Sequence, residues 1–409
     1  MGKALMVLAQ PDGNWANGDE TNFFGGSDQS TESNTQVSCT EDATFSLMAG
    51  RILSGNSGTA TLRFRDAGAN GNQTFQIVGS PGAAEDATNT DVLSAGDLFN
   101  VAYTDTGTNS VPAWMKVNVE FASGHGNFHG GSVFGGAVFD VASATRFICL
   151  GGSLTIDGNA TENSVEWKNR GYTSFEALQV RVSANARTNT STFKNRIDSG
   201  DGSLQIDYAA GATGLVTDTS PSDSLSDGQT INASITLDTG VEDLTVRFVG
   251  ATLKSSSNKS EIWAGVQNGV NRVASSTAFY YPIGGSTTGT NISEENARIK
   301  VGFAAVVSNL RCYLSANNYA GNATLKLYQN GSAVLTTTIT ASGGAAWYEN
   351  NSDTITIDAD DELSFEFDEG TSGTITIQSV GITFAPVAAP GGTILPQMMQ
   401  HGLFLGMRT

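Results

Sequence analysis

Residues that could carry acid–base or metal chemistry are few and scattered in this sequence. The three histidines are His125, His129 and His401. A metal site could combine His125 and His129 with a carboxylate from Glu120 or Asp140. The HxxxH spacing, however, brings both rings to one face only in a helix, and the surrounding segment is too rich in glycine to form one. We therefore expect an exposed or interface-lining loop here, and no metal site.

Other catalytic constellations are equally weak. The acidic clusters at residues 358–362 and 198–201 resemble calcium ligands, but they lack a DxDxDG pattern. No GxSxG elbow or phosphate-binding loop occurs. A pair of carboxylates of the glycosidase type could still be formed by some of the 40 acids, which leaves a β-sandwich hydrolase as a third interpretation. We predict a protein that is not an enzyme and that has no cofactor.

Aromatic side chains offer one binding chemistry. Tryptophan and tyrosine rings stack on sugars, and the chain has five tryptophans. Trp167 matches Ile299 of a later repeat, which indicates a packing role. Trp347 beside Tyr348 is the better surface candidate. This pair supports an alternative hypothesis of glycan binding.

The composition favours strands as the elements that hold these residues. The 409-residue chain is 39% apolar but only 15% charged, and it contains 48 glycines. Long exposed helices need more Lys, Glu and Arg than this. The net charge of −19 argues against nucleic acid and against an anionic membrane surface as partners. We expect an all-β fold.

The sequence contains three tandem copies of one repeat. Ser-Ala-Asn at residues 183–185 recurs at 315–317, an offset of 132, and the same offset relates Thr161-Glu162 to Ser293-Glu294. A more diverged first copy contains Thr31-Glu32. Repeats with a fixed period indicate repeated structural units.

Each copy contains about eight short alternating segments, the number expected for a β-sandwich. In the third copy, Asn330-Gly331 predicts a tight hairpin. Each copy is expected to close on a strand that ends in phenylalanine, at Phe121, Phe248 and Phe384.

The expected fold is three tandem antiparallel β-sandwich (jelly-roll-like) domains with extended N- and C-terminal arms. The expected segments are an N-terminal arm (1–22), repeat 1 (23–122), a Gly-rich connector (123–144), repeat 2 (145–253), a second connector (254–276), repeat 3 (277–386) and an apolar C-terminal tail (387–409).

The tail is the most apolar stretch and lies outside the last repeat. A free apolar terminus promotes aggregation, so we expect it to be covered, either by its own chain or by a neighbouring subunit. The candidate interface residues are Leu395, Met398, Met399, Leu403, Phe404, Leu405 and Met407. No signal peptide or membrane span is evident, which predicts synthesis in the host cytoplasm.

The pattern of turns and strands in the repeat resembles that of tandem jelly-roll or sandwich modules in structural proteins of tailed-bacteriophage virions. The likeness rests on residues 315–317, 322–325, Asn330-Gly331 and the strand that closes at Phe384. It implies a capsid decoration, head-fibre or spike protein on the virion surface. The implied partners are other copies of the chain and virion proteins such as the major capsid protein. The competing hypothesis is a carbohydrate-binding adhesin or receptor-binding protein.

Overall fold

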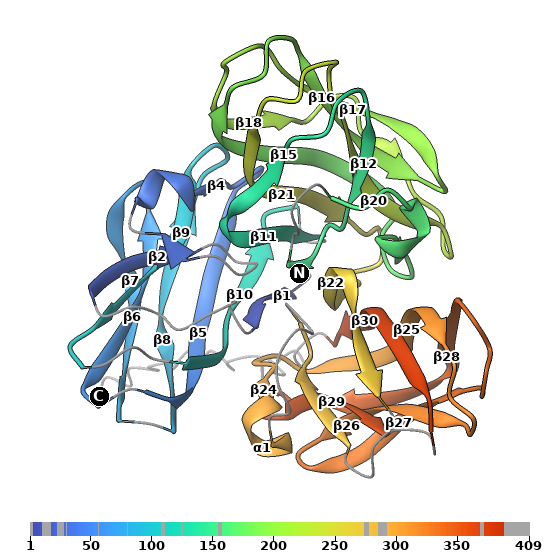
Figure 1. Ribbon diagram of the computed structural model, residues 1–409. Helices are drawn as coiled ribbons and strands as arrows, with labels where there is room; N and C mark the ends of the chain where they lie inside the picture. Colours follow the sequence, from blue (N-terminus) through green and yellow to red (C-terminus); the bar gives the residue numbers. More distant parts are fainter. Residues whose placement is uncertain are drawn as a thin grey trace, which may run out of the picture.

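Almost all regular structure in the described part of the chain is β-strand, which confirms the all-β prediction. The strands form antiparallel sandwiches around three hydrophobic cores (Figure 1). The computed structural model describes residues 3–9, 18–22, 28–29, 31–55, 57–79, 81–107, 111–123, 126–153, 158–273, 278–284, 293–368 and 372–387.

The first sandwich encloses a core that includes Phe45, Phe64 and Phe99. One sheet has the order β1 (Lys3–Ala9), β10 (Val111–Phe121), β5 (Ala43–Ser54) and β8 (Gly82–Leu93). The other has the order β3 (Asp28–Gln29), β2 (Gly18–Asn22), β9 (Leu98–Asp105), β6 (Thr59–Asp66) and β7 (Ala69–Val78), with β4 (Val37–Ser38) beside β9.

The second sandwich repeats this arrangement. One sheet runs from β18 (Gly214–Asp218) through β15 (Ser174–Asn185) and β21 (Leu244–Lys254) to β11 (Gly126–Phe139), with β19 (Asp223–Ser224) beside β15. The other contains β12 (Thr145–Ile148), β20 (Thr230–Thr236), β16 (Ser191–Ile197) and β17 (Gly200–Tyr208), with β14 (Trp167–Lys168) beside β20.

The third sandwich has the same order again. Its first sheet contains β22 (Ser260–Val273), β30 (Thr374–Pro386), β25 (Ala305–Asn317) and β28 (Ala346–Ile357), and the short β13 (Gly152–Ser153) joins β22 to β11. Its second sheet contains β23 (Phe279–Pro282), β29 (Glu362–Asp368), β26 (Ala323–Gln329) and β27 (Ser332–Ile339), with β24 (Ile299–Lys300) beside β29.

The predicted offset of 132 residues is visible in the elements themselves. β16 begins at Ser191 and β26 at Ala323. The short helical turns η1 (Glu32–Asn34), η2 (Glu162–Ser164) and α1 (Glu294–Ala297) follow Thr31, Thr161 and Ser293 at their N-caps, as the sequence matches require.

The predicted hairpin joins β26 and β27. Asn330 and Gly331 both have positive φ, 52° and 83°. A type I′ turn needs positive φ at both central positions, and Asn-Gly supplies it at the least steric cost. Along β17, buried Leu204, Ile206 and Tyr208 alternate with exposed residues, as expected of a strand with one solvated face.

The segments expected to be an arm and connectors need correction. The N-terminal arm contains β1, connector 123–144 contains β11, and connector 254–276 contains β22. These strands pair with β10, β21 and β30, respectively. The second and third repeats therefore start one strand earlier than their sequences indicated, and the first starts two strands earlier, because β2 also lies within residues 1–22. Glycines and polar residues interrupt the apolar alternation of β11 and β22, whereas β1 is apolar and was expected to lie in the arm.

The expected closing position Phe248 is also wrong. β21 continues to Lys254, so Phe248 lies in its middle. Strand pairing makes Leu253 the counterpart of Phe384, because it lies opposite Phe175 as Phe384 lies opposite Val307. The Phe248 side chain packs in the core of the first sandwich rather than in that of the second, to which β21 belongs.

Candidate functional site

The three sandwiches meet where their first strands, β1, β11 and β22, lie beside one another (Figure 1). The Asn127 side chain in β11 donates hydrogen bonds to the carbonyl oxygens of Leu5, at 3.5 Å, and Glu261, at 2.9 Å. The Ser260 hydroxyl donates to the Lys3 carbonyl at 3.1 Å. We call this meeting point of β1, β11 and β22 the central junction.

Each first strand gives an apolar side chain to the core of a neighbouring sandwich. Leu5 of the first sandwich belongs to the third core, and Trp263 of the third belongs to the second core. Phe128 of the second sandwich belongs to the first core, together with Phe248. The exchange closes a ring, because each sandwich completes the core of one neighbour and is completed by the other. Alternate residues of a strand point to opposite faces, which lets one strand serve two cores.

The same cyclic order recurs in polar contacts between the sandwiches. Gln179 on β15 donates to the Ser38 carbonyl and accepts from the Ser38 N–H, at 2.7 and 3.0 Å. Arg311 on β25 donates to the Lys168 carbonyl at 3.0 Å. On β5, the Arg51–Glu295 ion pair joins the first sandwich to the third. The three sandwiches thus have a pseudo-threefold arrangement.

A fully buried ion pair lies beside the central junction. Arg311 Nη2 is 2.6 Å from Glu261 Oε2, and the two side chains are 2% and 0% exposed. Glu261 also accepts hydrogen bonds from the Trp263 indole N–H at 2.9 Å and from the Arg170 N–H at 2.5 Å. Burial raises the pKa of Glu261, while the charge of Arg311 opposes that rise. A buried charge needs such partners to be tolerated.

His129, expected in a loop, is instead buried in β11. Its Nε2 is 2.8 Å from the Tyr172 hydroxyl, and its ring is stacked on Trp263 with 4.0 Å between centroids. Burial lowers the pKa of His129 to about 3, and Arg311 adds to the effect. The imidazole is therefore neutral near pH 7. Its proposed partner Asp140 lies just beyond the end of β11, whereas His125 lies outside the described residues.

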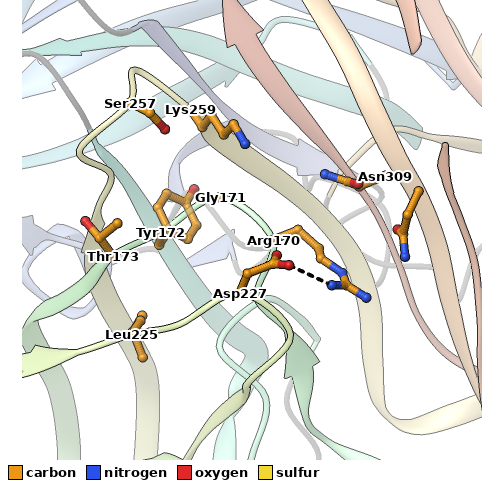
Figure 2. Close-up of a pocket in the computed structure, with 10 residues that line it drawn as sticks. Arg170, Gly171, Tyr172, Thr173, Leu225, Asp227, Ser257, Lys259 and Asn309 are labelled. Carbon is orange, nitrogen blue, oxygen red and sulfur yellow. Dashed lines mark hydrogen bonds and ion pairs between the residues drawn. The ribbon is translucent and has the colours of Figure 1, made fainter. Parts of the chain in front are cut away.

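A polar pocket of about 360 Å³ opens between the second and third sandwiches, next to the central junction (Figure 2). Arg170, on the loop after β14, spans its wall, paired with Asp227 at 3.1 Å and Glu349 at 2.5 Å. Its other lining residues are Gly171, Tyr172, Thr173, Leu225, Ser257, Lys259, Asn309 and Asn351. Charged and amide side chains converge in this pocket.

The expected glycan-binding pair does not form one surface. Trp347 and Tyr348 are consecutive in β28, so they point to opposite faces. Tyr348 is buried in the third core and contacts the Asn317 amide. Trp347 is half-buried, packed against Tyr313, with the Lys168 ammonium 5.8 Å above its ring.

Other sequence candidates have mixed outcomes. Trp167 and Ile299 are both buried, which confirms the packing role expected of this position. The three cysteines, Cys39, Cys149 and Cys312, are all buried. Asp361, in an acidic cluster, accepts hydrogen bonds within its own turn, from Asp358 N–H at 2.7 Å. No group of three or more metal-ligating side chains was found among the described residues.

The candidate interface residues of the tail lie outside the described residues, which end at Val387. This applies to Leu395, Met398, Met399, Leu403, Phe404, Leu405 and Met407. No helix in the described part of the chain is long and apolar enough to cross a membrane.

Sequence reasoning missed the pocket and the buried pair altogether. Arg311 and Glu261 are 50 residues apart, and nothing local marks them as partners. One signal was present. Arg311 lies at the strand position that Gln179 occupies in the second copy and Ala49 in the first. A charged residue is therefore found at this buried position only in the third copy.

Comparisons with known proteins add no function. No family model and no curated protein matches the chain. Solved structures show faint likenesses. The insecticidal delta-endotoxin Cry8Ea1 from Bacillus thuringiensis is 9% identical, with 54% of each chain covered and a TM-score of 0.19. PNGF-II is 8% identical, with 84% of this chain and 99% of that chain covered and a TM-score of 0.20. A Paenibacillus xanthan lyase is 10% identical, with 94% and 51% covered and a TM-score of 0.17.

This chain therefore spans about half the length of the delta-endotoxin that it matches. TM-scores this low carry no argument about activity or partners.

Proposed function

We propose that this chain is a non-enzymatic structural protein of a virus particle, a capsid decoration or surface protein that acts through contacts between subunits. The observation that supports this best is the ring of three sandwiches that complete one another's cores. Exchange of core side chains makes separation of the sandwiches costly, because it would expose Leu5, Phe128 and Trp263 to water. Such a unit suits a role that requires rigidity.

Charge and termini support a role in assembly. A net charge of −19 keeps copies of the chain apart in solution. Specific association then requires a favourable local contact, which the apolar residues 387–409 would supply by docking on another subunit. The proposed partners are further copies of the chain and the major capsid protein.

The experiment compares the full chain with a version that ends at residue 386. The oligomeric state is measured by light scattering after gel filtration, and incorporation is measured by mass spectrometry of particles purified from cultures that carry the gene. We expect the full chain to copurify with particles, and the truncated chain to lose incorporation or self-association. Absence of the full chain from particles would contradict the virion assignment. Unchanged incorporation and oligomeric state of the truncated chain would contradict the docking role of the tail.

The carbohydrate-binding alternative retains one supporting observation, the half-buried Trp347 beside Lys168. A glycan array with Trp347→Ala tests it. Tyr348→Ala serves as a stability control because Tyr348 lies in the core. Binding of one sugar class that disappears in Trp347→Ala, with the fold intact, would favour the adhesin over the structural role.

A further inference from the structure

The polar pocket between the second and third sandwiches is built from three separate parts of the chain. Arg170 and Asp227 come from loops of the second sandwich, and Lys259 comes from the link between β21 and β22. Asn309 and Asn351 come from β25 and β28 of the third. Figure 2 shows Lys259 extending toward Asn309, with the Arg170–Asp227 pair below them. A ligand here would contact both sandwiches.

The charges of the pocket leave one cation uncompensated. The two carboxylates, Asp227 and Glu349, are balanced by two cations: Arg170 pairs with both, and Lys168 pairs with Glu349. Within the described part of the chain, the Lys259 ammonium has no ion pair or hydrogen bond. A ligand with a single negative charge would balance Lys259. A ligand with two charges would also face the carboxylates of Asp227 and Glu349.

The amide groups define the rest of the ligand. The Asn309 amide N–H donates to the Thr383 hydroxyl at 3.3 Å, and the Asn351 amide N–H donates to Glu349 at 3.1 Å. Both amide oxygens remain without a partner among the described residues. An amide oxygen only accepts hydrogen bonds, so it needs a donor such as a hydroxyl. Ionised phosphate or sulfate oxygens supply no donor.

Backbone geometry holds Asn309 in this place. The pairing of β25 with β30 shifts register between Ser308 and Arg311, which places Asn309 in a β-bulge. Its φ of 54° lies in the left-handed region, which asparagine tolerates better than most residues. A bulge re-aims a side chain that a regular strand would direct elsewhere.

We propose that this pocket binds a polyhydroxylated monocarboxylate, of the chemical class of a hexuronic acid. Lys259 receives the carboxylate, and the amide oxygens of Asn309 and Asn351 accept hydrogen bonds from hydroxyl groups. The volume of about 360 Å³ lies within the range of small-molecule sites. The inference is independent of the proposed structural role, because it depends only on the residues of this pocket.

The test is isothermal titration calorimetry of the full chain with sodium glucuronate and sodium galacturonate, beside glucose and glucose 6-phosphate. We expect at least one uronate to bind with a Kd in the millimolar range or tighter, and glucose and glucose 6-phosphate to bind more weakly. Lys259→Gln should weaken uronate binding by about tenfold, the effect of losing one charge-assisted hydrogen bond. Asn351→Ala should also weaken uronate binding, because it removes one of the two amide oxygens that accept hydrogen bonds.

The matched control is Lys194→Gln, a lysine on β16 that pairs with Asp201 away from the pocket. It should leave binding unchanged, and thermal unfolding of all variants should show an intact fold. Absence of binding by either uronate would overturn the inference. Equal binding by glucose, tighter binding by glucose 6-phosphate, or unchanged uronate binding in Lys259→Gln would do the same.

Discussion

Replacement of Arg311 by methionine probes the buried ion pair beside the central junction. Methionine retains most of the aliphatic length but removes the charge 2.6 Å from Glu261. Glu261, with a fully buried side chain, keeps only the hydrogen bonds from Trp263 and Arg170. Loss of one member of such a pair costs about 3–5 kcal/mol of unfolding free energy, because the other charge stays buried without compensation.

The assay is urea unfolding followed by tryptophan fluorescence, since Trp263 donates its indole N–H to Glu261. Addition of Glu261→Gln to Arg311→Met removes the stranded charge, so the double variant should recover part of the lost stability. The control is Arg51→Met, which breaks a contact to the 73%-exposed Glu295 and should cost less than about 1 kcal/mol. If Arg311→Met cost no more than Arg51→Met, the reasoning about the buried pair would be refuted.

Three further predictions concern buried groups at the contacts between sandwiches. The pKa of His129 is lowered from 6.5 to about 3, so the unfolded chain binds the proton more readily and stability falls as pH drops from 6.5 toward 3. At about 1.4 kcal/mol per pKa unit the loss is roughly 4–5 kcal/mol, and urea midpoints of His129→Gln should vary less with pH over that range. The pKa of Lys116 is lowered by burial from 10.5 to about 7, so stability should rise with pH between those values. Lys116→Met should abolish that rise in the same assay, and an unchanged slope would contradict the assignment. Gly130→Ala should cost about 1–3 kcal/mol by overpacking, because the added Cβ would overlap the Phe248 ring; a neutral effect on the melting temperature would contradict that packing.

Local features of the fold could be predicted from the sequence because they depend on neighbouring residues. The offset of 132, with its match of Thr161-Glu162 to Ser293-Glu294, and the Asn330-Gly331 turn all rest on short segments. The number of sandwiches followed from the same repeats, since each copy buries its own alternating strands.

The contacts between sandwiches could not be predicted in this way. β11 contains many glycines, and Gly130 is one because the Phe248 ring occupies the space beside it, at the register position where the third sandwich carries Trp263. The glycine at position 130 of β11 therefore depends on contact with Phe248, which is far away in the sequence. The pocket residues are likewise brought together only when the second and third sandwiches pack, so no motif marks them.

The most direct test of the account is differential scanning calorimetry of the full chain. Sandwiches that complete one another's cores should unfold together, in one transition whose calorimetric enthalpy equals its van't Hoff enthalpy. Separate transitions for the three sandwiches, with a calorimetric enthalpy well above the van't Hoff value, would contradict the ring of exchanged core residues.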